Sequence, residues 1–372
     1  MWVLRSDAVT VWNNKEVQKR LSWYRAVMKN LKPAKFLIAK RIPAQVGVKD
    51  LESMGREELW RLHEDLSSEF RKAHESVKAG KLDAAPAAEV SFLDVKIALS
   101  ERLVEHCEFC ERRCGVNRRK GELGFCRVGY VSRVSTWFHH FGEEGPLIGE
   151  GGSGTIFFSG CNFGPCVYCQ NWDISSDPGN GGEVNPKMLA LISKRLSSEN
   201  AANINYVGGD PTPNLHTILA SLKHLDVNIP QLWNSNMYCS LEAMKLLAEI
   251  IDIWLPDFKY GSDDCARRLS KVEKYFETVS RNHRIAYENG DMIIRHLVLP
   301  NHLECCTKPV LKWISENTPN VLVNIMGQYH PDYLVARNPS MYPDISRRPS
   351  AREMEEAYGY ARALKIVFEP VS

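Results

Sequence analysis

The chain of 372 residues is 44% hydrophobic and 25% charged, which is ordinary for a globular protein. Its formal net charge of +2 gives no electrostatic argument for nucleic acid as the main partner. No apolar run is long enough to span a membrane, and Arg5 and Asp7 interrupt the N-terminal apolar residues, so we expect neither a membrane span nor a signal peptide. The 11 cysteines gather in clusters, which favours metal sites in a reducing, cytoplasmic compartment over disulfides.

The first hundred residues are predicted to be a helical region with little chemistry. Apolar side chains repeat there at helical spacing, at Val17, Leu21, Tyr24 and Met28 and again at Leu59, Leu62, Leu66 and Phe70. Residues 84–88 are predicted to be a short linker. We expect this region to pack on the next domain or on a partner.

A cysteine-rich segment follows at residues 101–150. Cys107, Cys110, Cys114 and Cys126 lie within twenty residues, and four thiolates can complete one closed metal site. The residues leave open a structural zinc ion or a second iron–sulfur cluster. Basic residues surround these cysteines, namely Arg112, Arg113, Arg118, Arg119, Lys120 and Arg127. They form either a solvated face or a docking surface for an acidic electron donor such as ferredoxin or flavodoxin.

Three further cysteines follow the apolar run 155–158, which is predicted to be a buried strand. Cys161, Cys166 and Cys169 share one loop, and three thiolates suit an iron–sulfur cluster that normally takes four. One iron would then stay open, as in catalytic metal sites that keep a free position. The alternatives are a zinc knuckle or thiols that merely pack, but three on one short loop are unusual for packing.

Strands and helices alternate from residue 151 to about 330. The predicted strands are apolar and β-branched, as in a parallel sheet buried on both faces, at 155–158, 204–207, 231–233, 251–255, 292–299 and 321–326. Asn185-Pro186 and Ser240 are expected to begin helices between them. The pattern predicts an α/β fold, either a barrel or an open sheet.

Polar residues follow every predicted strand. After the cysteine loop come Gly208-Gly209-Asp210, Asn234-Ser235-Asn236, Asp257-Phe258-Lys259, Arg295-His296 and Gln328-Tyr329-His330. Because the carboxyl ends of parallel strands meet on one face, these groups are expected to form one active site.

These motifs resemble radical S-adenosylmethionine (SAM) enzymes, most closely the pyruvate formate-lyase-activating-enzyme-like branch (PflX-type). The resemblance covers roughly residues 101 to 345 and rests on the cysteine loop with its flanks, on Asp257-x-Lys259 and on Gln328-Tyr329-His330. It implies a partial (β/α)6 TIM-type barrel and a [4Fe-4S] cluster on Cys161, Cys166 and Cys169. The family has three residues between its first two cysteines, whereas this chain has four, and we expect Gly164-Pro165 to absorb the extra one.

The resemblance also implies a SAM site. Gly208 and Gly209 would offer backbone carbonyls to the SAM amino group, with Asp210 in place of the usual glutamate. Asn234, Ser235 and Asn236 would bind its ribose or methionine part. Lys259 would pair with its carboxylate, Asp257 would orient that lysine or bind a monovalent cation, and His330 would lie near the adenosyl group. The guanidinium fork of Arg295 could hold a carboxylate as well, or Arg295 could point to the barrel exterior. Turns, helix caps and a structural ion pair remain the alternatives for single residues.

The implied activity is that of an oxidoreductase: reductive cleavage of SAM to a 5′-deoxyadenosyl radical that takes hydrogen from a substrate. A glycyl-radical enzyme glycine is one target, and another peptide, a nucleotide or a metabolite is a second. A non-catalytic iron–sulfur or zinc protein remains the alternative from a different class. The cluster expected on Cys161, Cys166 and Cys169 already requires that the protein meet the iron–sulfur assembly machinery. We therefore favour an iron–sulfur cluster over zinc at the upstream cysteines as well.

The predicted organisation has four parts, at residues 1–100, 101–150, 151–345 and 346–372, the last a helix and tail. Pro331 to Pro349 is expected to form a lid-like loop because it is rich in Pro and Asn. The remaining thiols, Cys239, Cys265, Cys305 and Cys306, are predicted not to be ligands.

Overall fold

The computed structural model describes residues 6–81 and 86–372. Within them, one sheet has eight strands in the order β3-β1-β2-β4-β5-β6-β7-β8. The strands are β1 (Ser132–His140), β2 (Ser153–Phe158), β3 (Gly182–Val184), β4 (Ile204–Gly208), β5 (Gln231–Ser235), β6 (Ile253–Pro256), β7 (Asp291–Leu297) and β8 (Leu322–Met326). Strands β2, β4, β5, β6, β7 and β8 pair in parallel in that order. Strand β1 pairs antiparallel with β2, and β3 pairs antiparallel with β1. The predicted α/β partial barrel is confirmed.

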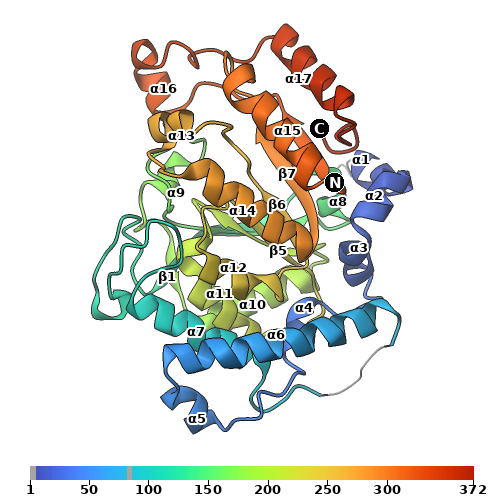
Figure 1. Ribbon diagram of the computed structural model, residues 1–372, viewed down its shortest axis with the longest axis vertical. Coiled ribbons are helices and arrows are strands. Elements are labelled where there is room, and N and C mark those ends of the chain that lie inside the picture. Colours follow the sequence, from blue (N-terminus) through green and yellow to red (C-terminus); the bar gives the residue numbers. More distant parts are fainter. Residues whose placement is uncertain (1–5, 82–85) are drawn as a thin grey trace.

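Helices connect the parallel strands and cover the sheet (Figure 1). They are α8 (Gly145–Ile148), α9 (Trp172–Ser175), α10 (Pro186–Ser198), α11 (Leu215–Lys223), α12 (Leu241–Ala248), α13 (Asp263–Ser270), α14 (Tyr275–Glu288), α15 (Lys308–Asn317), α16 (Tyr333–Arg337) and α17 (Ala351–Ala363). Short turns are η1 (Val11–Asn13), η2 (Arg118–Lys120), η3 (Thr212–Asn214), the π-helix η4 (Leu303–Thr307) and η5 (Pro339–Met341). Both predicted caps form: Asn185 accepts from the Met188 amide and Ser240 from the Ala243 amide.

The N-terminal helices pack against the sheet rather than standing apart from it. They are α1 (Ser6–Thr10), α2 (Lys15–Arg20), α3 (Ser22–Met28), α4 (Lys35–Ala39), α5 (Val48–Ser53), α6 (Arg56–Lys78) and α7 (Phe92–Glu105). Asp252, just before β6, accepts hydrogen bonds from Trp23 Nε1 at 2.8 Å and from the Lys35 amide at 3.0 Å. Residues of α3 and α4 therefore lie at the amino end of β6, away from the predicted site, whereas α6 packs on α7 and α7 packs on α11 and α12. Of the predicted linker 84–88, residues 84 and 85 lie outside the described residues.

A buried ion pair joins α7 to α12. Lys96 Nζ lies 2.6 Å from Glu249 Oε2, and its side chain is fully buried while that of Glu249 is 9% exposed. The Lys96 ammonium also donates to the Lys245 carbonyl at 3.0 Å and contacts His63 Nε2 at 2.9 Å. All three of its protons therefore have partners, which buried charges require.

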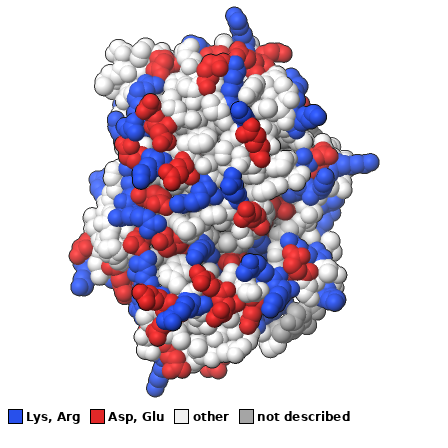
Figure 2. All heavy atoms as spheres, viewed as in Figure 1, with Lys and Arg blue, Asp and Glu red and all other residues white. Residues whose placement is uncertain are grey.

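The surface has mixed charge. In the view of Figure 2, Lys and Arg are interspersed with Asp and Glu, and neither sign dominates this face. None of the described helices has the length and apolar character that a membrane span needs.

Candidate active site

The loop after β2 brings Cys161, Cys166 and Cys169 to the carboxyl ends of the strands. All three are free thiols. The loop is clamped on two sides, because the Val167 amide donates to Leu269 O of α13 at 2.9 Å and the Val335 amide of α16 donates to Val167 O at 3.1 Å. In Figure 1, α9, α13 and α16 accordingly lie together. The extra residue of the loop falls in a bend over residues 162–164.

The environment of the three thiols fits a metal cluster. Burial raises the pKa of all three, to about 12 for Cys166, and the neighbouring thiols raise the pKa of Cys161 and Cys166 further. Bound iron would lower the pKa of these thiols instead, because a cysteine binds a metal as the thiolate. Lys259 lowers the pKa of both Cys166 and Cys169, which places its positive charge beside the two sulfurs. The three sulfurs do not all lie within 4.8 Å of one another.

The two glycines after β4 allow this turn to rest on the cysteine loop. A Cβ on Gly208, whose φ is +133°, would lie 2.1 Å from Phe158 O, and one on Gly209 would lie 2.2 Å from Gly160 O. The Gly209 and Asp210 amides donate to those same carbonyls at 2.9 and 3.0 Å. No residue with a Cβ fits at either position, so the two glycines allow the predicted SAM turn to lie against the cysteine loop.

Asp210 connects two loops of the site. Its Oδ2 accepts from Ser235 Oγ and from the Asn236 amide, both at 3.0 Å, and its Oδ1 accepts from the Thr212 amide at 2.9 Å. Asn236 Nδ2 in turn donates to Asn162 Oδ1 at 2.7 Å and lies 3.8 Å from Cys161 Sγ. The carboxylate of Asp210 is thus used to join the turns after β4 and β5, and Asn236 reaches the cysteine loop.

Asp257, Lys259 and Arg295 form one half-buried charge network. Asp257 lies 2.7 Å from Lys259 Nζ through Oδ2 and 2.8 Å from Arg295 Nε through Oδ1. Burial acts to raise the pKa of Asp257, but the Arg295 and Lys259 charges hold it below its usual value. Arg295 Nη2 also donates to Asn234 Oδ1, so Arg295 points into the site. Arg295 Nη1 also lies 3.8 Å from Glu143 Oε2, so the network joins two cations to two carboxylates.

Two buried glutamates, Glu143 and Glu144, complete the barrel interior. Glu143 Oε1 accepts from Asn205 Nδ2 at 3.0 Å and lies 3.1 Å from His140 Nδ1, and its Oε2 lies 3.8 Å from Arg295. Glu144 Oε1 accepts from Asn324 Nδ2 at 2.8 Å, whereas its Oε2 is buried without a hydrogen-bond partner among the described residues. Sequence reasoning missed both glutamates, because nothing in the neighbouring residues marks them as buried.

Glu144→Gln is expected to change the pH dependence of stability. Burial raises the pKa of Glu144 from 4.5 to about 7, with Arg295 opposing and Glu143 adding. Between these values the folded state binds more protons than the unfolded state, so this group lowers stability as the pH rises from about 4.5 to 7, by up to about 3 kcal/mol. Urea unfolding at pH 5 and pH 7.5 should therefore show that the variant gains stability relative to the wild type with rising pH. A constant difference would contradict the assigned pKa.

The segment from Pro331 to Pro349 covers the cysteine loop but is not the continuous loop that we predicted. It contains α16 and η5. Tyr333 stacks on Trp172 with ring centroids 5.3 Å apart, and Tyr329 packs against Tyr168 at 5.7 Å. His330, by contrast, hydrogen-bonds only weakly, with Nδ1 3.4 Å from Pro331 O. Stacking and the Val335 backbone bond give this segment regular structure that its composition did not indicate.

The upstream cysteines converge beside the first site. Cys107, Cys110, Cys114 and Cys126 line one cavity, together with Phe109, Arg112, Arg118, Phe125, Asn162, Thr212 and Pro213. Arg112 Nε donates to Asn162 O at 3.1 Å, which links this cavity to the cysteine loop. Burial raises the pKa of Cys110 and Cys126. No three of the four sulfurs lie within 4.8 Å of one another.

One residue of the predicted basic surface is not on the surface. Arg118 is 1% exposed, and its guanidinium donates to Pro213 O at 2.7 Å and to Gly129 O. Its charge therefore serves to satisfy backbone carbonyls around the cysteine segment, and the expectation that it docks a partner is wrong. Arg119 is exposed and pairs with Glu101 at 2.5 Å, and Lys120 is exposed.

Comparison with known proteins identifies the class. Residues 155–314 match the radical SAM superfamily, so the chain carries a radical SAM domain. The uncharacterized protein MJ0674 of Methanocaldococcus jannaschii is 44% identical over 355 residues, which cover 93% of this chain and 98% of that protein. The chain belongs to the same family as this protein.

Solved structures give weaker likenesses. Streptococcus suis SuiB bound to its precursor peptide SuiA is 14% identical, with a TM-score of 0.41, over 82% of this chain and 62% of SuiB. SuiB bound to S-adenosylmethionine has a TM-score of 0.40 at 14% identity, over 56% of this chain and 47% of SuiB. TYW1 with a lysine-pyruvate adduct bound is 12% identical with a TM-score of 0.34, over 57% of this chain and 72% of that one. The chain thus spans less than two thirds of SuiB.

Proposed function

We propose that the chain is an enzyme that cleaves S-adenosylmethionine reductively, with a [4Fe-4S] cluster held by Cys161, Cys166 and Cys169. The carrying observation is that three free thiols share one loop beside Lys259, at the carboxyl ends of parallel strands in a radical SAM domain. A cluster held by these three thiols would supply the electron for reductive cleavage of the SAM sulfonium bond, which would yield a 5′-deoxyadenosyl radical able to take hydrogen from a substrate.

The surrounding residues would bind and orient SAM. Lys259, fixed by Asp257, would hold its carboxylate. The backbone at Gly208 and Gly209 lies against the cysteine loop and would accept from the amino group. Asn234, Ser235 and Asn236 at the end of β5 would bind the ribose or methionine part, with Arg295 and His330 as further contacts. Buried Phe163, Val167 and Tyr168 would exclude water from the cluster.

The test is anaerobic reconstitution with iron and sulfide, followed by reduction with dithionite in the presence of SAM. Formation of 5′-deoxyadenosine, measured by chromatography, would support the proposal. A fully loaded cluster that neither binds nor cleaves SAM would favour the alternative, a non-catalytic iron–sulfur or zinc protein.

For the substrate, we propose a protein, with the backbone glycine of a glycyl-radical enzyme as the first candidate. This proposal rests only on the likeness of Asp257-x-Lys259 to activating enzymes. It includes the proposal that the chain is of the pyruvate formate-lyase-activating-enzyme-like subtype. Co-purification with a glycyl-radical enzyme would support it. A different peptide or a metabolite as the hydrogen donor, found by loss of deuterium from labelled candidates, would count against it.

At the upstream cysteines we propose a second iron–sulfur cluster rather than zinc. One zinc ion with Zn–S bonds of about 2.3 Å holds its sulfurs about 3.8 Å apart, whereas several irons spread them farther. Cys107 and Cys114 lie close enough to hydrogen-bond, but no third sulfur of the set joins them within 4.8 Å, which supports the cluster. Its place beside Asn162 of the first loop suits a role in passing electrons inward.

An acidic electron donor such as ferredoxin or flavodoxin is proposed to dock near these cysteines. Arg119→Glu and Lys120→Glu should slow turnover about 3- to 10-fold with the protein donor, and less at high salt. Turnover with dithionite should stay unchanged. Lys312→Glu on α15, whose side chain is 63% exposed, is the matched control. Equal slowing with both reductants would rule the docking surface out.

A further inference from the structure

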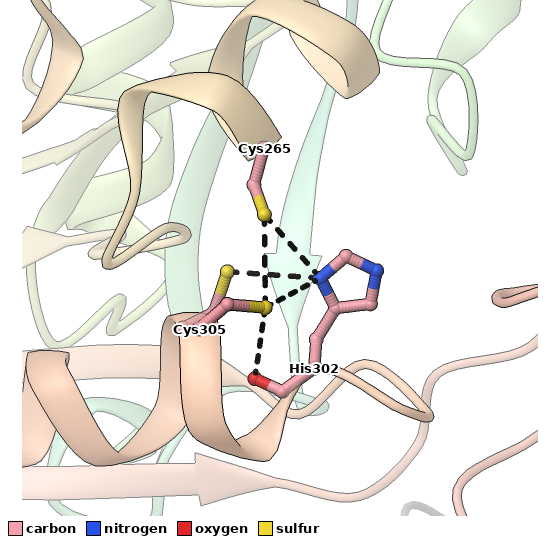
Figure 3. A group of neighbouring side chains, drawn as sticks. Cys265, His302 and Cys305 are labelled. Carbon is pink, nitrogen blue, oxygen red and sulfur yellow. Dashed lines mark hydrogen bonds between the residues drawn. The ribbon is translucent and has the colours of Figure 1, made fainter.

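Four side chains from two segments of the chain meet outside both cysteine sets. Cys265 lies in α13, His302 precedes η4, and Cys305 and Cys306 lie in η4. Their ligand atoms all lie within 4.8 Å of one another. Figure 3 shows the sulfurs of Cys265 and Cys305 directed at one ring nitrogen of His302. We predicted these cysteines to be non-ligand thiols, and His302 carried no signal at all.

The distances are those of a tetrahedral metal site. Cys265 Sγ and Cys305 Sγ are 3.7 Å apart, which is too long for a disulfide. His302 Nδ1 lies 3.6, 3.3 and 3.8 Å from the sulfurs of Cys265, Cys305 and Cys306. Zinc bonds of about 2.3 Å to sulfur and about 2.0 Å to nitrogen give tetrahedron edges of about 3.8 Å and 3.5 Å. The four ligand atoms therefore already lie at the separations that one zinc ion requires.

A second set of contacts orients the histidine. His302 Nε2 lies 2.9 Å from Asp344 Oδ2, so it carries the proton and leaves Nδ1 free to bind a metal. Arg268 pairs with the same carboxylate, with Nη1 3.2 Å from Oδ1. A carboxylate that fixes the second nitrogen of a histidine is a recurrent support of zinc ligands.

The backbone is shaped for this convergence. His302, Cys305 and Cys306 stand at positions i, i+3 and i+4 of one turn, which place them on the same face. The turn is widened, since the amides of both Cys306 and Thr307 donate to His302 O, at 3.0 and 3.2 Å. A Cβ on Gly261 would lie 2.8 Å from the carbonyls of both cysteines, so this glycine lets the chain leading into α13 approach them.

We propose that Cys265, His302, Cys305 and Cys306 bind one Zn²⁺ ion in a closed, structural site. Four protein ligands leave no position for a substrate, which excludes a catalytic role. The ion would fasten α13 to η4 and, through Asp344, to the segment after β8. The far end of α13 carries Leu269 and Ser270, which contact Val167 and Cys166 of the cysteine loop. The zinc would thus hold the helix on which that loop rests.

The experiment uses the full chain, purified anaerobically after growth with zinc. Elemental analysis should give one zinc per chain at this site. Zinc K-edge absorption, which does not detect iron, should give three sulfurs at about 2.3 Å and one nitrogen at about 2.0 Å. Cys305→Ser and Cys306→Ser should lose this zinc, whereas Cys239→Ala, a buried thiol outside the group, should keep it.

A second variant keeps the test valid if the cysteine variants misfold. Asp344→Asn retains all four ligands and should lower zinc affinity about 10- to 100-fold in a chelator competition. The proposal is overturned if the wild type contains no zinc, or if iron rather than zinc is bound to these ligands. Coordination by sulfur alone would also overturn it, because it would assign the zinc to the upstream cysteines. Unchanged affinity in Asp344→Asn would remove His302 from the ligand set.

Discussion

Replacing Cys161, Cys166 or Cys169 by alanine, one at a time, is expected to reduce 5′-deoxyadenosine formation to background. Each thiol would bind a different iron, so loss of one leaves the cluster without a protein ligand at that corner. All three cysteines are half-buried on the loop after β2. The measurement is chromatography of anaerobic reactions with dithionite, together with the iron and sulfide content of each variant.

The matched control for this series is Cys239→Ala. Cys239 is fully buried and contacts Thr212 Oγ1 at 3.2 Å, but it belongs to none of the three cysteine groups. It should keep both its cluster and its activity. Full activity in any of the three loop variants would show that the spacing of four residues between Cys161 and Cys166 has moved a ligand elsewhere.

Lys96→Met is expected to destabilise the protein by about 3–5 kcal/mol, because it leaves the carboxylate of Glu249 buried without its cation. Urea denaturation of the apo chain, followed by circular dichroism, would measure the loss. Lys96→Met combined with Glu249→Gln should recover part of it, since no uncompensated charge remains.

Lys78→Met is the matched control for the buried pair. Lys78 pairs with Glu75 at 3.1 Å, but its side chain is 45% exposed, so its loss should cost less than about 1 kcal/mol. An equally small effect at Lys96 would mean that water reaches the Lys96–Glu249 pair and that α7 is less firmly packed on α12 than its contacts indicate.

The parallel strands could be predicted from the sequence because each is a short apolar run followed by polar residues. The strands predicted at 155–158 and 204–207 lie within β2 and β4, and the other four differ from the observed bounds by at most two residues. β1 was not predicted, because it is a half-exposed antiparallel strand whose polar and aromatic residues do not alternate cleanly. β3 has only three residues and no apolar run.

The candidate site was predictable where its signal is local. Cysteine spacing, the glycine pair and Asp257-x-Lys259 all lie in short segments that end strands. Arg118 was misplaced because a buried arginine and an exposed one look alike in a basic run. The group of Cys265 and His302 was missed for a different reason: its ligands come from segments 37 residues apart, and only the packing of α13 on η4 brings them together.

The bond between Trp23 and Asp252 has a consequence for how the chain is made. The two residues are separated by 229 positions, so the ribosome must add that many residues before Trp23 can meet its acceptor. At about 5–20 residues per second, this takes about 10 to 50 s. For that time the apolar faces of the first helices lack the sheet on which they finally pack. Newly made N-terminal segments are therefore expected to be bound by chaperones until β6 has emerged.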